Sequence, residues 1–197
     1  MIAGLILAAG ESRRMGRDKA LLTYRGRSFL ENLVDNLGAA GIAKVTVVLG
    51  HHAEEILRAV NLATVRVVVN RDYQRGQTSS LQAGLAAVDA DQPEAVILCL
   101  VDHPAISVEV IGKLVERFES TRPPVIIPTH QGQRGHPILI NRTLFPELLE
   151  LHPDEPANTV IRNYRASTHF EEVADPGILL DVDDPADYER LIVGSRQ

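Results

Sequence analysis

The chain has 197 residues, of which 45% are hydrophobic, and a formal net charge of −6. This length can bury one substantial core, so we predict a single domain over residues 1–197. The negative charge argues against nonspecific binding to nucleic acid or to anionic membranes, and the apolar runs are too short to span a bilayer, so we expect a cytoplasmic protein.

Short β-branched or leucine-rich runs alternate with segments of helical periodicity along the chain. The runs are typical of parallel strands buried on both faces: Ile2–Ala8, Lys44–Leu49, Val65–Val69, Ala95–Val101 and Val125–Pro128. The expected helices are Ser28–Leu37, Ala53–Val60, Ser79–Val88, Ser107–Phe118, Thr143–Leu151 and Pro185–Val193. This alternation predicts an α/β fold with a doubly wound, Rossmann-like and mostly parallel sheet, helices on both faces, and a ligand site beyond the carboxyl ends of the strands.

Two local patterns add detail to this scheme. Ser28 and Glu31 have the spacing of a capping box, so Ser28 is expected to cap the first helix. Cys99, the only cysteine, lies in an apolar run, which favours a buried strand residue over a nucleophile or a disulfide partner.

The region Thr129–Leu151 departs from the alternation. Its first part, Thr129–Gly135, is polar, and Pro137–Ile140 is a short apolar run that suits an antiparallel or edge strand. We expect residues 129–151 to form a small inserted β lobe that contacts a substrate. Further along, Ile178–Leu180 reads as an apolar strand that ends in acidic residues.

The segment 7–19, LAAGESRRMGRDK, follows the first predicted strand directly. Gly10 lets the backbone pass close to a ligand, and successive amide groups in such a turn can bind an anion. Arg14 and Lys19 can neutralise phosphate oxygens. The glycine spacing is neither that of a P-loop nor that of a dinucleotide fingerprint. Chemistry alone therefore leaves two interpretations, a triphosphate cradle and a solvated basic surface loop.

This string resembles the signature of the MobA-like NTP transferases, L-A-A-G-x-S-x-R-M-G-x-x-K, and is similar to the loops of sugar-nucleotide pyrophosphorylases. The resemblance implies a nucleotide-diphospho-sugar transferase-like fold and a single nucleotidyltransferase domain. Its substrates would be an NTP and a phosphorylated acceptor, with release of pyrophosphate. The nucleotide-binding residues implied in this loop are Leu7, Ala8, Ala9, Gly10, Glu11, Ser12, Arg14 and Lys19.

A second polar segment, Gly76–Gly84, leads from the third predicted strand into a helix, shortly after Asn70. Thr78 or Ser79 can simply cap this helix, because small hydroxyl side chains are common there. A helix N-terminus also presents unpaired N–H groups to a ligand. The family resemblance implies the second role, in which Asn70, Thr78, Ser79 and Ser80 flank the base of the nucleotide.

Asp102 ends the most apolar strand, in the run Leu100–Pro104. An aspartate there can be a turn former. However, the run resembles the family's L-x-D-x-P motif, which implies that Asp102 binds Mg²⁺, with Mn²⁺ as an alternative. We expect Arg14, Lys19 and Asp102 to be catalytic. Asp181 is our candidate for a second metal ligand, with Asp183 less favoured, and Asp183 or Asp184 should cap the last helix at Pro185.

The triplet Gly135-His136-Pro137 resembles the molybdenum cofactor cytidylyltransferase branch, which implies that Arg134 and His136 contact the acceptor. A histidine bonded only to backbone is the alternative. Ala9 replaces a glycine found in guanylyltransferases of the family, and its methyl group favours a pyrimidine base. The first hypothesis is therefore cytidylyl transfer from CTP to molybdopterin.

Three other functions stay open at this stage. The protein could transfer a nucleotide to a sugar or polyol phosphate, or it could be a nucleotide- or cofactor-binding chaperone without turnover. A dinucleotide-dependent oxidoreductase is disfavoured because the fingerprint loop is missing.

Aromatic residues make up 4% of the chain and offer no obvious interface, so we expect a monomer or a weak homodimer.

Overall fold

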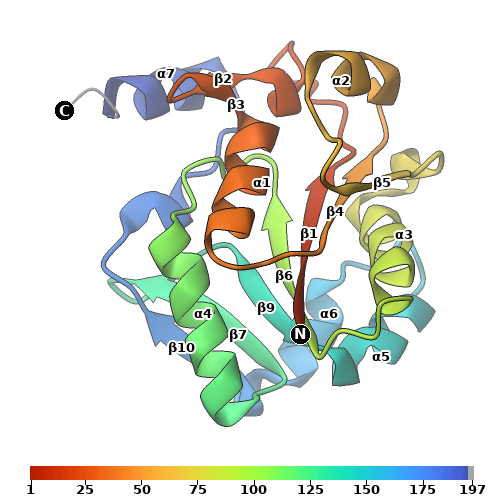
Figure 1. Ribbon diagram of the computed structural model, residues 1–197, viewed down its shortest axis with the longest axis vertical. Helices are drawn as coiled ribbons and strands as arrows, with labels where there is room; N and C mark the ends of the chain where they lie inside the picture. The colour runs from red at the N-terminus through yellow and green to blue at the C-terminus, as the bar shows by residue number, and fades with distance from the viewer. Residues whose placement is uncertain (195–197) are drawn as a thin grey trace.

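The computed structural model describes residues 1–194 and shows one central sheet with helices around it (Figure 1). The strands of this sheet are β1 (Ile2–Ala8), β4 (Val45–Leu49), β5 (Arg66–Val69), β6 (Ala95–Leu100), β7 (Val125–His130), β8 (Gln133–Arg134), β9 (Ile138–Asn141) and β10 (His169–Glu172). Their order is β10-β7-β9-β6-β1-β4-β5, and β8 pairs with β7. A separate hairpin consists of β2 (Thr23–Tyr24) and β3 (Arg27–Ser28).

The helices lie close to the predicted positions, except for α6, which was not predicted. They are α1 (Phe29–Ala39), α2 (Ala53–Ala59), α3 (Gln77–Asp89), α4 (Val108–Thr121), α5 (Phe145–Glu150), α6 (Asn158–Asn163) and α7 (Pro185–Gly194). The capping box is confirmed, because Ser28 Oγ accepts from Glu31 N and Glu31 accepts from Ser28 N. None of the helices within residues 1–194 is long and apolar enough to cross a membrane.

The sheet is mostly parallel and doubly wound, as predicted. β1 pairs in parallel with both β4 and β6, and the chain runs outward from β1 to β5 before it crosses back to β6. The order of the strands therefore reverses between β1 and β6, which is where open α/β sheets bind ligands. β9 inserts antiparallel between β6 and β7. The region 129–151 is thus antiparallel, as expected, but its main strand lies inside the sheet and not at an edge.

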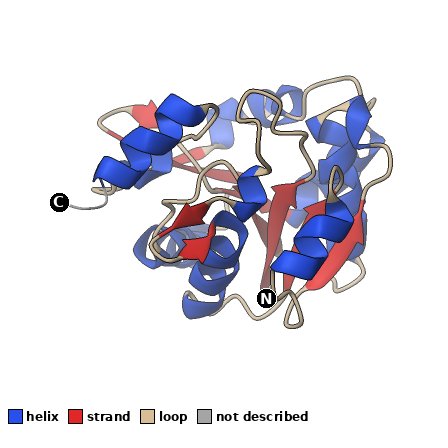
Figure 2. Ribbon diagram, turned by 90° about the horizontal axis from the view of Figure 1, so that it is seen from above, coloured by secondary structure: helices blue, strands red, loops and turns tan. Residues whose placement is uncertain are grey.

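Each face of the sheet has its own core, because alternate side chains of a strand point to opposite faces. Ile6 of β1 belongs to the core under α1 and α4, whereas Leu5 and Leu7 belong to the core under α3, α5 and α6. Figures 1 and 2 show these two layers of helices with the sheet between them. The buried layers hold the carboxyl ends of β1 and β6 rigidly side by side.

One local expectation was wrong, and one alternative is excluded. The segment expected as a strand before Asp181 is instead a 3₁₀ turn, Pro176–Leu179, because Pro176 cannot donate to a sheet and Asp175 caps the turn at Gly177 N. Neither Thr78 nor Ser79 caps α3, whose N-cap is Gly76. At the last helix the prediction held, since Asp184 Oδ1 accepts from Ala186 N and Asp187 N ahead of α7.

Close packing of α3 on the sheet depends on Gly84. A Cβ atom there would lie 2.5 Å from Leu5 Cδ1 and 2.7 Å from Val48 Cγ2. We expect Gly84→Ala to lower the free energy of unfolding by about 1–3 kcal/mol through overpacking. Gly112→Ala in α4 is the matched control, because its Cβ meets nothing within 4 Å, and it should raise stability by about 0.5–1 kcal/mol. Urea denaturation of both variants tests this; equal effects would contradict the close packing.

Candidate active site

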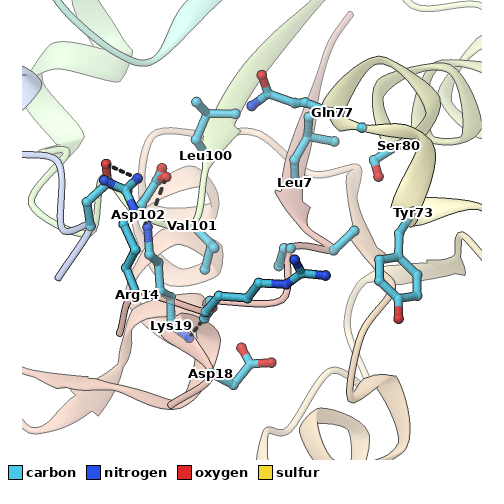
Figure 3. Close-up of a pocket in the computed structure, with 17 residues that line it drawn as sticks. Leu7, Arg14, Asp18, Lys19, Tyr73, Gln77, Ser80, Leu100, Val101 and Asp102 are labelled. Atoms are coloured by element: carbon cyan, nitrogen blue, oxygen red, sulfur yellow. Dashed lines mark hydrogen bonds and ion pairs between the residues drawn. The ribbon is translucent and has the colours of Figure 1, made fainter. Parts of the chain in front are cut away.

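A cavity of about 360 Å³ opens at the carboxyl ends of β1 and β6. It is bordered by the loop after β1, by the segment after β5 and by the residues that follow β6. Its lining residues are Leu7, Ala8, Ala9, Gly10, Ser12, Arg13, Arg14, Asp18, Lys19, Tyr73, Gly76, Gln77, Ser80, Leu100, Val101, Asp102 and Asp183 (Figure 3). The cavity therefore lies where the reversal of strand order predicts a ligand site.

The loop after β1 is folded around Ser12. This residue has a φ of +50°, and its carbonyl accepts hydrogen bonds from Met15 N and Gly16 N. Its hydroxyl accepts from Lys19 N at 3.1 Å. Ser12 thereby fixes the point at which Lys19 leaves the loop and enters the cavity.

Two cations and two carboxylates meet at one end of the cavity. Lys19 Nζ lies 2.7 Å from Asp183 Oδ1 and 3.5 Å from Asp102 Oδ2, and Arg14 Nη2 lies 2.6 Å from Asp183 Oδ2. Figure 3 shows Arg14, Lys19 and Asp102 converging there. The hydrogen bonds from Lys19 and then Arg14 hold the pKa of Asp183 below its usual value. The structure brings the predicted residues Arg14, Lys19 and Asp102 together and adds Asp183, which was the less favoured candidate for a metal ligand.

The carboxylates fit a divalent cation. Asp102 Oδ1 is buried and has no hydrogen-bond partner, so it is an unused oxygen ligand in the cavity that Asp183 also lines. No group of three histidine, cysteine or acidic residues within positions 1–194 could hold a metal ion. Mg²⁺ and Mn²⁺ suit a site in which two carboxylates supply part of the ligands and substrate phosphates supply the rest.

Asp181, our first candidate for the second metal ligand, does not line this cavity. It borders a neighbouring groove formed in part by Pro104 and Val182. Partial burial and the negative charges of Asp183 and Asp102 raise its pKa. The geometry therefore favours Asp183 over Asp181 as the partner of Asp102.

The opposite wall of the cavity consists of Tyr73, Gln77 and Ser80 (Figure 3). Gly50 makes room for this wall, because a Cβ atom there would lie 2.8 Å from Tyr73 Cβ. Tyr73 and Gln77 were absent from the sequence-based candidates. The signal for Tyr73 was its place after the third strand, since its residue type alone indicates nothing about the site.

Three candidate residues hold this wall in place and do not line it. Asn70 Nδ2 donates to Ser79 Oγ and Ser80 Oγ, both at 3.0 Å. Thr78 Oγ1 donates to Glu155 O at 2.6 Å and accepts from Ala157 N. Asn70, Thr78 and Ser79 are buried, and of the neighbouring residues Thr78, Ser79 and Ser80 it is Ser80 that borders the cavity.

On the side of β9, the rings of His103 and His136 lie 4.7 Å apart. Gly135 leaves room for the backbone of Ile178, because a Cβ atom at residue 135 would lie 2.4 Å from Ile178 O. His136 N donates to the same oxygen. Arg134 points elsewhere, over the ring of Phe170 at 4.8 Å. The structure thus brings His136, but not Arg134, towards Asp102.

Cys99 and His51 have structural roles. Cys99 is fully buried, and burial raises its pKa to about 12, which agrees with a strand residue rather than a nucleophile. His51 donates its backbone N–H to Ala9 O at 3.2 Å, and its ring lies edge-on to Tyr73. The histidine therefore supports the cavity wall from behind.

Comparison with known proteins decides the family. A family model described as the MobA-like NTP transferase domain matches residues 4–169. The chain belongs to the MobA-like NTP transferases. This membership confirms the resemblance seen in the loop after β1 and makes the protein a nucleotidyltransferase by family.

Relatives of this MobA-like transferase differ in what their names say they do. Nicotine blue oxidoreductase of Paenarthrobacter nicotinovorans is 32% identical and aligns over 97% of this chain and 96% of its own. Molybdenum cofactor cytidylyltransferase of Escherichia coli (strain K12) is 27% identical over 93% and 92%. Rv0371C of Mycobacterium tuberculosis H37Rv, in a crystal structure with manganese, is 29% identical over 98% of both chains, with a TM-score of 0.82.

The partly buried His136 gives a prediction about the pH dependence of stability. Burial, with the charge of His103, lowers the pKa of His136 from 6.5 to about 3. Between pH 6.5 and 3, the unfolded chain therefore binds a proton at this histidine more readily than the folded protein does. The free energy of unfolding should fall as pH drops through this range. We expect the NMR signals of His136 to stay constant from about pH 5 to 8, the range in which an ordinary histidine titrates. A transition near neutral pH would contradict its burial.

Proposed function

We propose that this transferase moves a cytidylyl group from CTP to molybdopterin and releases pyrophosphate. The observation that carries the proposal is the meeting of Lys19 and Arg14 with Asp102 and Asp183 in one cavity. This set supplies two cations for a triphosphate and two carboxylates for a divalent cation. The similarity to a molybdenum cofactor cytidylyltransferase supports the choice of substrates.

In the proposed reaction, a terminal phosphate of the acceptor attacks the α-phosphorus of CTP in line. The P–O bond to the β-phosphate breaks, and pyrophosphate leaves. A phosphate nucleophile is already ionised near neutral pH, so no general base is required. Lys19 and Arg14 offset the charge on the transferred and departing groups, and the loop from Ala8 to Ser12 positions the triphosphate. A cation held by Asp102 and Asp183 would supply Lewis-acid stabilisation of the phosphates.

Ala9 supports CTP as the nucleotide. It is 5% exposed and lines the cavity, so its methyl group takes up space beside the base. Gln77 and Ser80 on the opposite wall offer an amide and a hydroxyl, which can both donate and accept hydrogen bonds. Such a narrow site with adaptable polar groups suits a pyrimidine better than a purine.

The acceptor is proposed to lie on the side of β9. There the ring of His136 packs against that of His103, and His103 in turn contacts the carboxylate of Asp102. An uncharged imidazole there can donate a hydrogen bond to an acceptor phosphate. Arg134, which is exposed on β8, would contact the acceptor only at its outer end. A sugar or polyol phosphate remains the alternative acceptor.

The test is pyrophosphate release with each of CTP, GTP, UTP and ATP in the presence of Mg²⁺ or Mn²⁺. Molybdopterin and a panel of sugar and polyol phosphates serve as acceptors. We expect release with CTP and molybdopterin only. Release with a sugar phosphate instead would support the alternative acceptor. CTP binding without release from any acceptor would support the binding chaperone.

The relative named nicotine blue oxidoreductase gives a second candidate, an oxidoreductase, which can be tested with a nicotinamide dinucleotide as the reductant. Its alignment covers nearly the whole of both chains, although the loop after β1 lacks the dinucleotide fingerprint. Oxidation of NADH or NADPH, followed by absorbance with a quinone-type dye as acceptor, separates the two. Turnover in that assay with no pyrophosphate release would overturn the proposal.

A further inference from the structure

We infer that Asp183 exchanges partners when the nucleotide binds. In the nucleotide-free protein it holds Arg14 and Lys19, and it releases both to the triphosphate when its carboxylate turns to the divalent cation. This inference rests on the proposed triphosphate site. It gives Asp183 a further role: when the cation binds, Asp183 frees Lys19 to bind phosphate.

The contacts show that one carboxylate occupies both cations. Asp183 Oδ1 accepts from Lys19 Nζ at 2.7 Å, while Asp183 Oδ2 accepts from Arg14 Nη2 at 2.6 Å. Asp102 Oδ2 also lies near Lys19 Nζ, at 3.5 Å. The two cations and two carboxylates carry no net charge together, so this end of the cavity does not attract a triphosphate strongly in this arrangement.

Burial makes the pairing at Lys19 significant. The Lys19 side chain is 12% exposed and that of Asp183 is 29% exposed, whereas Arg14 is 71% exposed. An ion pair shielded from water is screened less by salt than an exposed one. A phosphate that approaches Lys19 therefore competes with Asp183, and the competition is strongest at this residue.

The backbone around Asp183 is fixed, so only its side chain needs to move. Asp183 N donates to Asp187 Oδ2 at 2.9 Å, and Val182 N donates to Asp102 O at 2.9 Å. These bonds tie the segment to the start of α7 and to the end of β6. Rotation of the Asp183 side chain can then move the carboxylate from Lys19 towards Asp102 without displacement of the helix.

A consequence is that the cation and the triphosphate assist each other's binding. The cation draws the Asp183 carboxylate away from Lys19, and the freed cationic groups then bind phosphate. By thermodynamic linkage, the triphosphate raises the affinity for the cation by the same factor. Asp183→Asn should weaken this coupling, because the neutral amide neither holds Lys19 as strongly nor binds the cation as well.

The experiment measures binding of inorganic tripolyphosphate by calorimetry, first in EDTA and then with Mn²⁺. This probe has no base and no acceptor, so the result does not depend on CTP or molybdopterin. In EDTA, Asp183→Asn should bind tripolyphosphate about threefold to tenfold more tightly than the wild type. With Mn²⁺, the wild type should gain more affinity than the variant. Complex formation between Mn²⁺ and tripolyphosphate in solution is common to both and cancels.

Asp181→Asn is the matched control. It removes the same charge two residues away, but Asp181 has no ion pair with Lys19 or Arg14 within residues 1–194. Its affinity in EDTA should change by less than that of Asp183→Asn, because Asp181 acts on Lys19 only through its charge and not through a direct ion pair. Circular dichroism checks that each variant is folded, and Asp183→Ser replaces Asp183→Asn if the latter is not.

The outcomes separate the exchange from the proposed function. If the wild type binds tripolyphosphate in EDTA and Asp183→Asn binds it equally or more weakly, the exchange is overturned and the triphosphate site remains. An equal gain for Asp181→Asn would also overturn it, because general charge would then explain the effect. If the wild type binds neither tripolyphosphate nor CTP with Mn²⁺, the proposed site itself fails.

Discussion

Lys19→Ala is expected to lower kcat for pyrophosphate release by about a hundredfold to a thousandfold. Lys19 is the one cation of the described site that contacts both carboxylates, and its Nζ lies within the cavity. In the proposed reaction it offsets charge that develops on the departing pyrophosphate. An alanine leaves that charge without a partner in a partly buried site, where electrostatic effects are larger than in water.

Arg17→Ala is the matched control for this prediction. Arg17 belongs to the same loop and carries the same charge, but it is exposed and borders a different cavity. Its kcat should stay near that of the wild type. Lys19→Arg should restore only part of the rate, because a planar guanidinium does not replace a compact ammonium group. A folded Lys19→Ala variant with near-normal kcat would show that Lys19 has no part in the chemistry.

Most strands and helices of the fold could be predicted from the sequence, because the residues that indicate each of them lie within one short segment. The apolar run of β1, the capping box of Ser28 and the carboxylate at the end of β6 each lie within one segment. β10 and α6 were missed for the same reason. His169–Glu172 is polar and becomes a strand only by pairing in parallel with β7, a contact that the residues themselves do not indicate.

The site was predicted less completely, because its details depend on contacts between distant segments. Thr78 and Ser79 have the residue types of a ligand site, yet their hydroxyl groups bond to backbone around residues 72–76 and 155–157. Asp181 and Asp183 look equivalent in the sequence. The bonds from Val182 N to Asp102 O and from Asp183 N to Asp187 Oδ2 hold the segment so that the second of them lies against Lys19.

The other large effect is expected at Asp102. Asp102→Asn should lower kcat by about a hundredfold to a thousandfold and weaken Mn²⁺ binding, because it replaces a charged oxygen ligand by a neutral amide. The fold should persist. Within residues 1–194, the carboxylate of Asp102 has ion-pair contacts only with Lys19 and, at 3.9 Å, with His103. Its backbone oxygen, which the substitution keeps, accepts from Val182 N.

Mn²⁺ binding, followed by electron paramagnetic resonance with CTP present, also decides between the two candidates for the second ligand. If Asp183 is the partner of Asp102, then Asp102→Asn and Asp183→Asn both weaken Mn²⁺ binding, and Asp181→Asn leaves it nearly unchanged. The opposite ranking of the last two variants would restore Asp181 as the ligand. Asp102→Asn with unchanged Mn²⁺ affinity and kcat would remove the carboxylate at the end of β6 from the mechanism, and with it the reason to place the cation beside Lys19.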